Sequence, residues 1–210
     1  MKKIGILLCI LFLTGCTNIS KLSYDDMVEK FATVRMAANI YRTGYKYYLP
    51  DGMNITDSTL YNETIKDNEY TYYLHVDIIS YYNKVDKNYQ KTDKAIYSTG
   101  LSYDDKKGYV EINLVENDKY LVEIMYNYAK IEVIVDKDNC NRAMLSAINI
   151  LNSIVYNDII IANMLGDDIL SFSEEDFDIF KTHSKEDDYI QIEDIVEDDD
   201  YQEVDTDLIN

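Results

Sequence analysis

Apolar residues first recur at helical spacing near the start of the chain. The segment Ser23-Tyr24-Asp25-Asp26 has the pattern of a capping box, with an acid three residues after a serine. The apolar positions that follow at intervals of three or four residues are Met27, Phe31, Val34 and Ala38. This spacing predicts a helix over about 24–40.

The next hundred residues alternate between apolar and polar positions, which is typical of half-buried strands. The segments expected to form strands are 45–49, 58–65, 69–82, 95–101, 109–115, 120–128 and 131–135. Turn signals such as Pro50-Asp51-Gly52 and Glu116–Lys119 separate them. Short turns imply antiparallel neighbours.

A second helical pattern follows at about 140–156, with Asp136–Asn139 as its expected cap. Its apolar stripe consists of Met144, Ala147, Ile148, Leu151, Ile154 and Val155. The apolar segment Ile159–Leu165 continues this helix or adds a strand. The order predicts an α+β fold, an antiparallel sheet of about five to seven strands packed by an N-terminal and a C-terminal helix.

The N-terminus has the features of a secretory signal. Met1-Lys2-Lys3 is followed by the apolar run Ile4–Leu13, which is too short to cross a bilayer core of about 30 Å. The next residues, Leu13-Thr14-Gly15-Cys16, resemble the lipobox of bacterial lipoproteins. The resemblance implies cleavage before Cys16, a diacylglyceryl group on its sulfur, and a chain held on the outer face of the cytoplasmic membrane. A type I signal peptide and a buried first helix are the alternatives.

Two segments are faintly similar to the PsbP/Mog1-like fold, over roughly residues 24–158. They are Tyr-Tyr-Leu-Pro-Asp-Gly at 47–52 and Ser153-Ile154-Val155-Tyr156 at the end of the late helix. Members of that group are mostly non-catalytic accessory or assembly proteins. The resemblance therefore implies a role other than catalysis.

The acidic residues are concentrated at the C-terminal end. The formal net charge is −19, and 18 of the 39 acids follow Gly166 together with only two lysines. This balance argues against nucleic acid as a partner. The expected parts are a signal peptide (1–15), a tether (16–22), one α+β domain (23–165), a partly packed extension (166–181) and an acidic, disordered tail (182–210).

Residues with catalytic potential are few. His75 and Asp77 alternate onto one face of the expected strand 69–82, where they are weak candidates for a metal site or a base with its orienting group. A structural histidine on a polar face is the alternative. Asp136–Asn141 begins like a calcium loop but lacks its glycine and its final glutamate, so it is interpreted as a turn and helix cap. No Gly-x-Ser-x-Gly or His-Glu-x-x-His motif is present, and no cofactor or metal is expected.

The remaining candidates are cysteine and tyrosine. Cys9 leaves with the signal peptide and Cys16 is the lipidation site, so Cys140 has no partner for a disulfide. The chain has 21 tyrosines, which indicate either sheet packing or an aromatic binding surface.

These observations lead to three functional hypotheses. The first is a membrane-anchored, extracytoplasmic lipoprotein that binds another envelope protein and is not an enzyme. The second is a small-ligand or transporter-associated binding lipoprotein, and the third is an envelope enzyme. A pocket lined by His75, Asp77 and tyrosines favours the second or third, whereas a shallow apolar patch favours the first.

Overall fold

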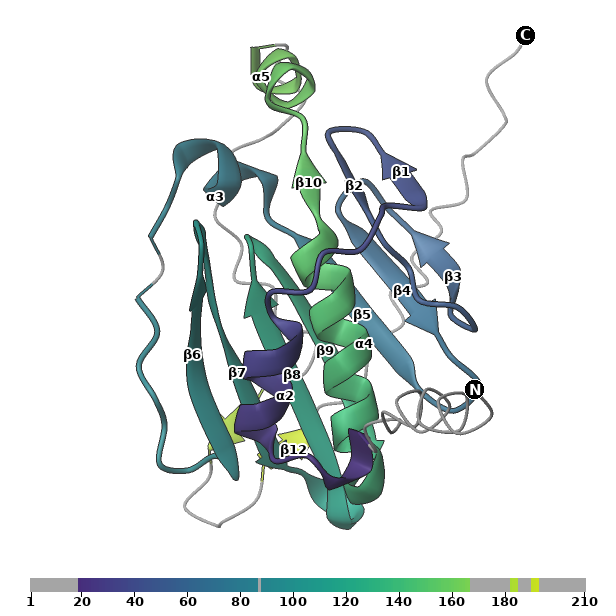
Figure 1. Cartoon of the computed structure of the whole chain (residues 1–210), viewed down its shortest axis with the longest axis vertical. Helices are drawn as coiled ribbons and strands as arrows, with labels where there is room; N and C mark the ends of the chain where they lie inside the picture. Colours follow the sequence, from purple (N-terminus) through teal and green to yellow (C-terminus); the bar gives the residue numbers. More distant parts are fainter. Residues whose placement is uncertain (1–18, 87, 167–181, 185–189, 193–210) are drawn as a thin grey trace, which may run out of the picture.

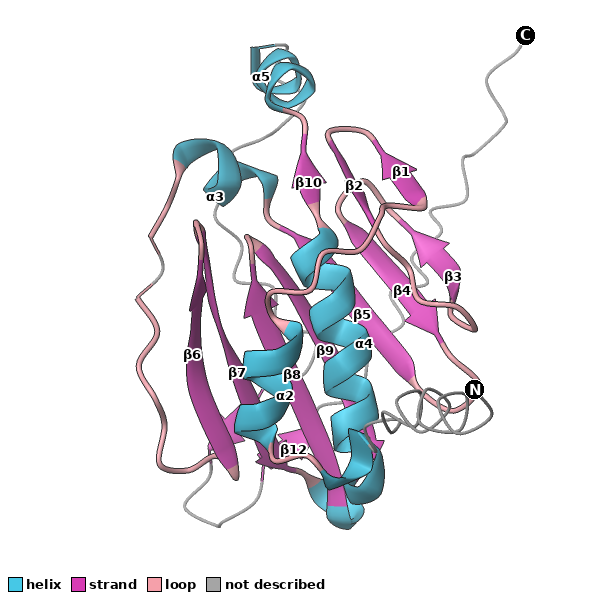
Figure 2. Cartoon of the chain, in the orientation of Figure 1, coloured by secondary structure: helices cyan, strands magenta, loops and turns pink. Residues whose placement is uncertain are grey.

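The fold is α+β, as the sequence predicts, and is built on one large antiparallel sheet. The computed structural model describes residues 19–86, 88–166, 182–184 and 190–192. Two helices, α2 (Tyr24–Phe31) and α4 (Cys140–Ser153), run side by side across one face of this sheet (Figures 1 and 2). The end of the sheet toward which both helices run is uppermost in Figure 1 and is called the upper end below.

The main sheet has seven strands in the order β3-β4-β5-β9-β8-β7-β6. Every neighbouring pair is antiparallel. The strands are β3 (Asn54–Ser58), β4 (Asn62–Lys66), β5 (Thr71–Val76), β6 (Tyr97–Tyr103), β7 (Lys106–Leu114), β8 (Lys119–Tyr126) and β9 (Ala129–Asp136). The five to seven strands expected from the sequence are therefore confirmed.

The core lies between this sheet and α4. Alternate residues of β5, β7, β8 and β9 face the helix, and each has at most 1 % of its surface exposed; they are Tyr72, Leu74, Val76, Val110, Ile112, Val122, Ile124, Tyr126, Ala129, Ile131, Val133 and Val135. The helix contributes Met144, Ala147, Ile148 and Leu151, all with 0 % exposure. The helix-on-sheet arrangement predicted for Ile148 and Leu151 is confirmed.

A small second sheet lies beside α4 at the upper end. It has the order β1-β2-β10, formed by β1 (Ile40–Arg42), β2 (Tyr45–Tyr47) and β10 (Val155–Tyr156). Two short helices, α3 (Ile78–Asn83) and α5 (Asp158–Gly166), lie next to it at the same end (Figure 1).

The first helix is shorter than predicted. It begins at Tyr24 with the expected capping box, but it ends at Phe31 and not near residue 40. Long-range contacts bind the backbone that follows: the Tyr126 hydroxyl donates to the carbonyl of Ala32 (3.4 Å), and the Asn152 amide donates to that of Val34 (2.7 Å). The helical spacing of Val34 and Ala38 does not reflect a helix.

The capping box gives a stability prediction. The Ser23 hydroxyl accepts a bond from the Asp26 backbone N–H (3.1 Å), and the Asp26 carboxylate accepts one from the Ser23 backbone N–H (3.3 Å). Ser23→Ala removes the first of these bonds and should lower the free energy of unfolding by about 1 kcal/mol. Urea unfolding measures the change. Ser23→Thr keeps the hydroxyl and serves as the control, so an equal loss in both variants would contradict a capping role.

Two of the predicted strands are wrong in extent. The segment 58–65 is not one strand, since β3 and β4 form a hairpin around residues 59–61, where no glycine or proline marks the turn. The segment 69–82 is also divided, because β5 ends at Val76 and α3 begins at Ile78.

The second helix begins at Cys140 as predicted, but its end and its capping differ from the prediction. It ends at Ser153, and Val155 lies in β10 with 52 % of its surface exposed rather than in the apolar stripe. The segment Asp136–Asn139 enters the helix through a 3-10 turn without a side-chain cap. The Asp136 carboxylate instead accepts from Lys119 Nζ (2.6 Å) and the Tyr70 hydroxyl (2.8 Å).

The regions at the two ends of the chain are described only in part. Ile19–Lys21, within the expected tether, forms a 3-10 turn. Within the expected tail, β11 (Thr182–Ser184) and β12 (Ile190–Ile192) form an antiparallel pair, and the rest of it lies outside the described residues together with the signal peptide. None of the helices in the described part is both long enough and apolar enough to span a membrane.

Candidate functional site

A polar pocket of about 360 Å³ opens at the upper end, where α2 and α4 both terminate. It lies between the C-terminal ends of these helices, α3 and the turns that join β6 to β7 and β8 to β9. Four aromatic rings line it, those of Tyr81, Tyr103, Tyr126 and Tyr156. We call this site the tyrosine pocket.

Four charged residues also line the tyrosine pocket, two cations and two anions. The Lys106 ammonium group donates to the backbone carbonyl and to the side-chain oxygen (2.9 Å) of Asn152 at the end of α4. Partial burial lowers the pKa of Lys106. Arg35 forms a surface ion pair with Asp104 (3.4 Å), and Asp105 has no hydrogen bond or ion pair within the described part of the chain.

The tight turn between β8 and β9 contributes Asn127 to the lining of the tyrosine pocket. Asn127 and Tyr128 both have positive φ angles, of 56° and 60°, which is uncommon for tyrosine. Bonds from outside the hairpin hold this turn: the Tyr156 hydroxyl donates to the Asn127 carbonyl (2.8 Å), and the Asp77 backbone N–H donates to the Tyr128 carbonyl (2.9 Å). These bonds hold the turn, and with it Asn127, in place beside the pocket.

Tyrosine rings stack against one another beside this turn. The ring of Tyr81 lies 3.8 Å from that of Tyr156, and Lys84 Nζ lies 3.5 Å from the centre of the Tyr81 ring. Burial is the main cause that raises the pKa of Tyr81 and of Tyr126 to about 12. Both hydroxyls keep their protons and already donate within the protein, that of Tyr81 to the Asp158 carboxylate (2.7 Å) and that of Tyr126 to the Ala32 carbonyl (3.4 Å).

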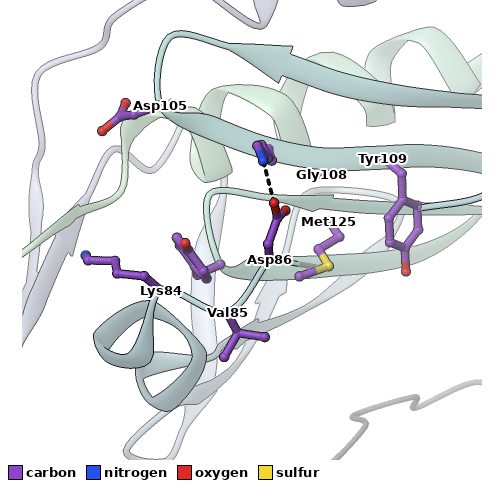
Figure 3. Close-up of a pocket in the computed structure, with 9 residues that line it drawn as sticks. Lys84, Val85, Asp86, Asp105, Gly108, Tyr109 and Met125 are labelled. Atoms are coloured by element: carbon purple, nitrogen blue, oxygen red, sulfur yellow. Dashed lines mark hydrogen bonds and ion pairs between the residues drawn. The ribbon is translucent and has the colours of Figure 1, made fainter. Parts of the chain in front are cut away.

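A second pocket, of about 240 Å³, lies on the other side of the β6–β7 turn (Figure 3). Its residues include Lys84, Tyr109 and Met125, and the ion pair between Lys107 and Asp86 (2.7 Å) crosses it. Asp105 lines this second pocket as well as the tyrosine pocket, and in Figure 3 its carboxylate points away from that ion pair. Because the salt bridge already occupies this smaller space, the tyrosine pocket is the better candidate for a ligand site.

His75 and Asp77, the residues singled out from the sequence, do not line the tyrosine pocket. The prediction that they share one strand face is wrong, because Asp77 lies beyond β5 and caps α3 by accepting from the Ser80 backbone N–H (2.8 Å). His75 lies on the sheet face opposite α4, where its Nδ1 contacts the Asn62 side-chain oxygen at 2.6 Å. Both residues make structural contacts.

The sheet face opposite α4 carries a row of glutamates that the sequence pattern did not reveal. Glu111, Glu123 and Glu132 are direct neighbours in register on β7, β8 and β9. Each has a donor beside it: the Tyr89 hydroxyl for Glu111 (2.6 Å), the Tyr109 hydroxyl for Glu123 and Lys130 Nζ for Glu132 (3.0 Å). Among the described residues, no three acidic, histidine or cysteine side chains are grouped so that they could hold a metal ion.

Of the two cysteines in the expected mature chain, Cys16 and Cys140, the structure describes only Cys140. Cys140 is fully buried at the start of α4, and burial raises the pKa of its thiol. It is a core residue and not an accessible nucleophile. Cys16 lies outside the described residues, so its lipidation stays a prediction.

Comparisons of the chain with protein-family models, with curated proteins and with solved structures gave no match. The similarity to the PsbP/Mog1-like fold stays a prediction. Any functional assignment therefore rests on the chain's own residues and on the geometry of the upper end.

Proposed function

We propose that this protein is a lipid-anchored extracytoplasmic lipoprotein that acts as a non-enzymatic binding module in the bacterial envelope. The observation that carries the proposal is the motif Leu13-Thr14-Gly15-Cys16 directly behind a short apolar run and a cationic start. The structural contacts made by His75 and Asp77 support a binding role over a catalytic one.

The position of Ile19, the first described residue, relative to the tyrosine pocket supports the proposed lipid anchor. Ile19 is three residues after Cys16 and lies in a 3-10 turn. Its carbonyl accepts a hydrogen bond from the Asn141 side-chain amide (2.8 Å), near the start of α4. The tyrosine pocket lies at the opposite end of α4, about 21 Å away for a helix of 14 residues. An acyl chain on Cys16 would hold the end of the domain where α4 starts at the membrane and direct the tyrosine pocket away from the lipid.

The anchor is tested by Cys16→Ser. Two acyl chains give stable membrane attachment, and the serine variant cannot receive them by this route. We expect most of the protein to move from the membrane fraction to the medium or to an uncleaved precursor, with loss of incorporated labelled fatty acid. Cys140→Ser is the matched control and should retain both the label and the membrane location. Unchanged membrane association and unchanged labelling of Cys16→Ser would contradict the proposal.

A second candidate function is a small-ligand-binding lipoprotein. The tyrosine pocket favours it, since a volume of about 360 Å³ lies at the lower end of the range of small-molecule sites. In this alternative the anchor is the same, but the partner is a small molecule and not another envelope protein.

A further inference from the structure

We propose that the tyrosine pocket binds a small organic ammonium ion. This inference deepens the small-ligand alternative by naming the chemical class of the ligand. It rests on the described domain and does not require the anchor at Cys16.

The charge balance of the pocket favours a cation. The side-chain charges of Arg35, Asp104, Asp105 and Lys106 sum to zero. The C-terminal ends of α2 and α4 also meet there, and each helix end adds about half a negative charge. The pocket is therefore electronegative overall.

The hydrogen bonds and the ion pair already formed in the tyrosine pocket also indicate a cationic ligand. Both cations of the pocket are engaged, Lys106 with the two oxygens of Asn152 and Arg35 with Asp104. Asp105 is the one charged residue lining the pocket that forms no hydrogen bond or ion pair within the described part of the chain, although its charge acts to raise the pKa of Lys106. A ligand ammonium group would supply a partner for Asp105, whereas a ligand anion would have to compete for groups that are already bound.

The aromatic lining suits an organic ammonium ion better than a metal ion. A tyrosine ring attracts a cation over its face, and Lys84 already lies over the ring of Tyr81 in this way at 3.5 Å. Both faces of that ring are covered, because Tyr156 stacks on it. The ring of Tyr103 has no aromatic partner among the described residues and lines the pocket beside Asp105. We infer that Tyr103 and Asp105 together receive the ammonium group.

The probe is choline, compared with its neutral isostere in which carbon replaces the ammonium nitrogen. Binding is measured by isothermal titration calorimetry on the purified full chain. The chain is kept in a non-ionic maltoside detergent, which has no ammonium group that could compete with choline. We expect choline to bind at least about tenfold more tightly than the isostere, a difference due to charge alone. Equal binding of the two, no binding of choline at millimolar concentration, or preferential binding of acetate would overturn the inference.

Asp105→Asn and Tyr103→Leu test the assigned residues. Each should weaken choline binding by about fivefold or more, because each removes one of two direct attractions. Asp51→Asn removes one negative charge from an exposed turn outside the pocket and should leave binding unchanged. Unchanged affinity in Asp105→Asn, or an equal loss in Asp51→Asn, would show that overall charge and not this site attracts choline. Neither result would bear on the membrane anchor.

Discussion

Leu151→Ala should lower the free energy of unfolding by about 2–5 kcal/mol. Leu151 has 0 % of its surface exposed and packs from α4 onto the strands of the main sheet. The truncation removes buried apolar surface and leaves a cavity that the surrounding β8 and β9 side chains cannot fill by small movements. Chemical denaturation followed by far-ultraviolet circular dichroism measures the loss.

A matched control for this substitution is Leu60→Ala in the turn between β3 and β4. Leu60 is 44 % exposed, so its truncation should change stability by less than about 1 kcal/mol. A loss of under about 0.5 kcal/mol for Leu151→Ala would contradict the packing of α4 on the sheet, since changes of that size are typical of surface positions.

The sequence predicted the fold well where the hydrophobic period and the turn residues agree. The stripe of α4 and the alternation in β7, β8 and β9 correspond to buried residues on facing layers. Prediction failed where a local signal was weak or misleading. The turn at residues 59–61 has no glycine or proline, and the apolar residue Ile78 continues the alternation of β5 although the strand has already ended.

The tyrosine pocket could not be predicted from the sequence. Its residues come from the end of α2, α3, two turns of the sheet and the end of α4, which lie far apart along the chain. No spacing rule brings Arg35, Lys106 and Asn152 together, because their proximity depends on how the helices pack on the sheet. The positive φ angle of Tyr128 is likewise invisible in the sequence, since asparagine or glycine is the usual residue for such a turn.

A buried charge links the two sheets and was also missed. Glu63 on β4 is 2 % exposed and accepts from Arg42 Nε (2.7 Å) and from the hydroxyls of Tyr45 (3.3 Å) and Tyr47 (2.5 Å). Burial, with added effects from Glu63, raises the pKa of both tyrosines, so each hydroxyl keeps its proton and donates. In the sequence, Glu63 looked like a polar position in a half-exposed strand.

Glu63→Leu should therefore destabilise the protein strongly, by about 3–5 kcal/mol. The substitution leaves two buried hydroxyls without an acceptor and leaves the partly buried Arg42 guanidinium with only the Tyr41 carbonyl (3.4 Å). Removing one partner of a buried pair costs far more than removing both. The double variant Arg42→Met with Glu63→Leu should regain part of the loss. Thermal and urea unfolding of the two single variants and the double variant measure this coupling.

The exposed pair Arg142–Glu69 provides the matched control for this prediction. It is as short as a good ion pair (2.5 Å), but its side chains are 48 % and 53 % exposed. Water screens such a pair, so Glu69→Leu should cost less than about 1 kcal/mol. Both pairs join an arginine to a glutamate, so the contrast depends on the burial of Glu63 and on the two tyrosine hydroxyls that it also accepts from. If Glu63→Leu were as mild as Glu69→Leu, or if the double variant were less stable than Glu63→Leu, Glu63 would not be the buried acceptor that holds the small sheet onto the main one.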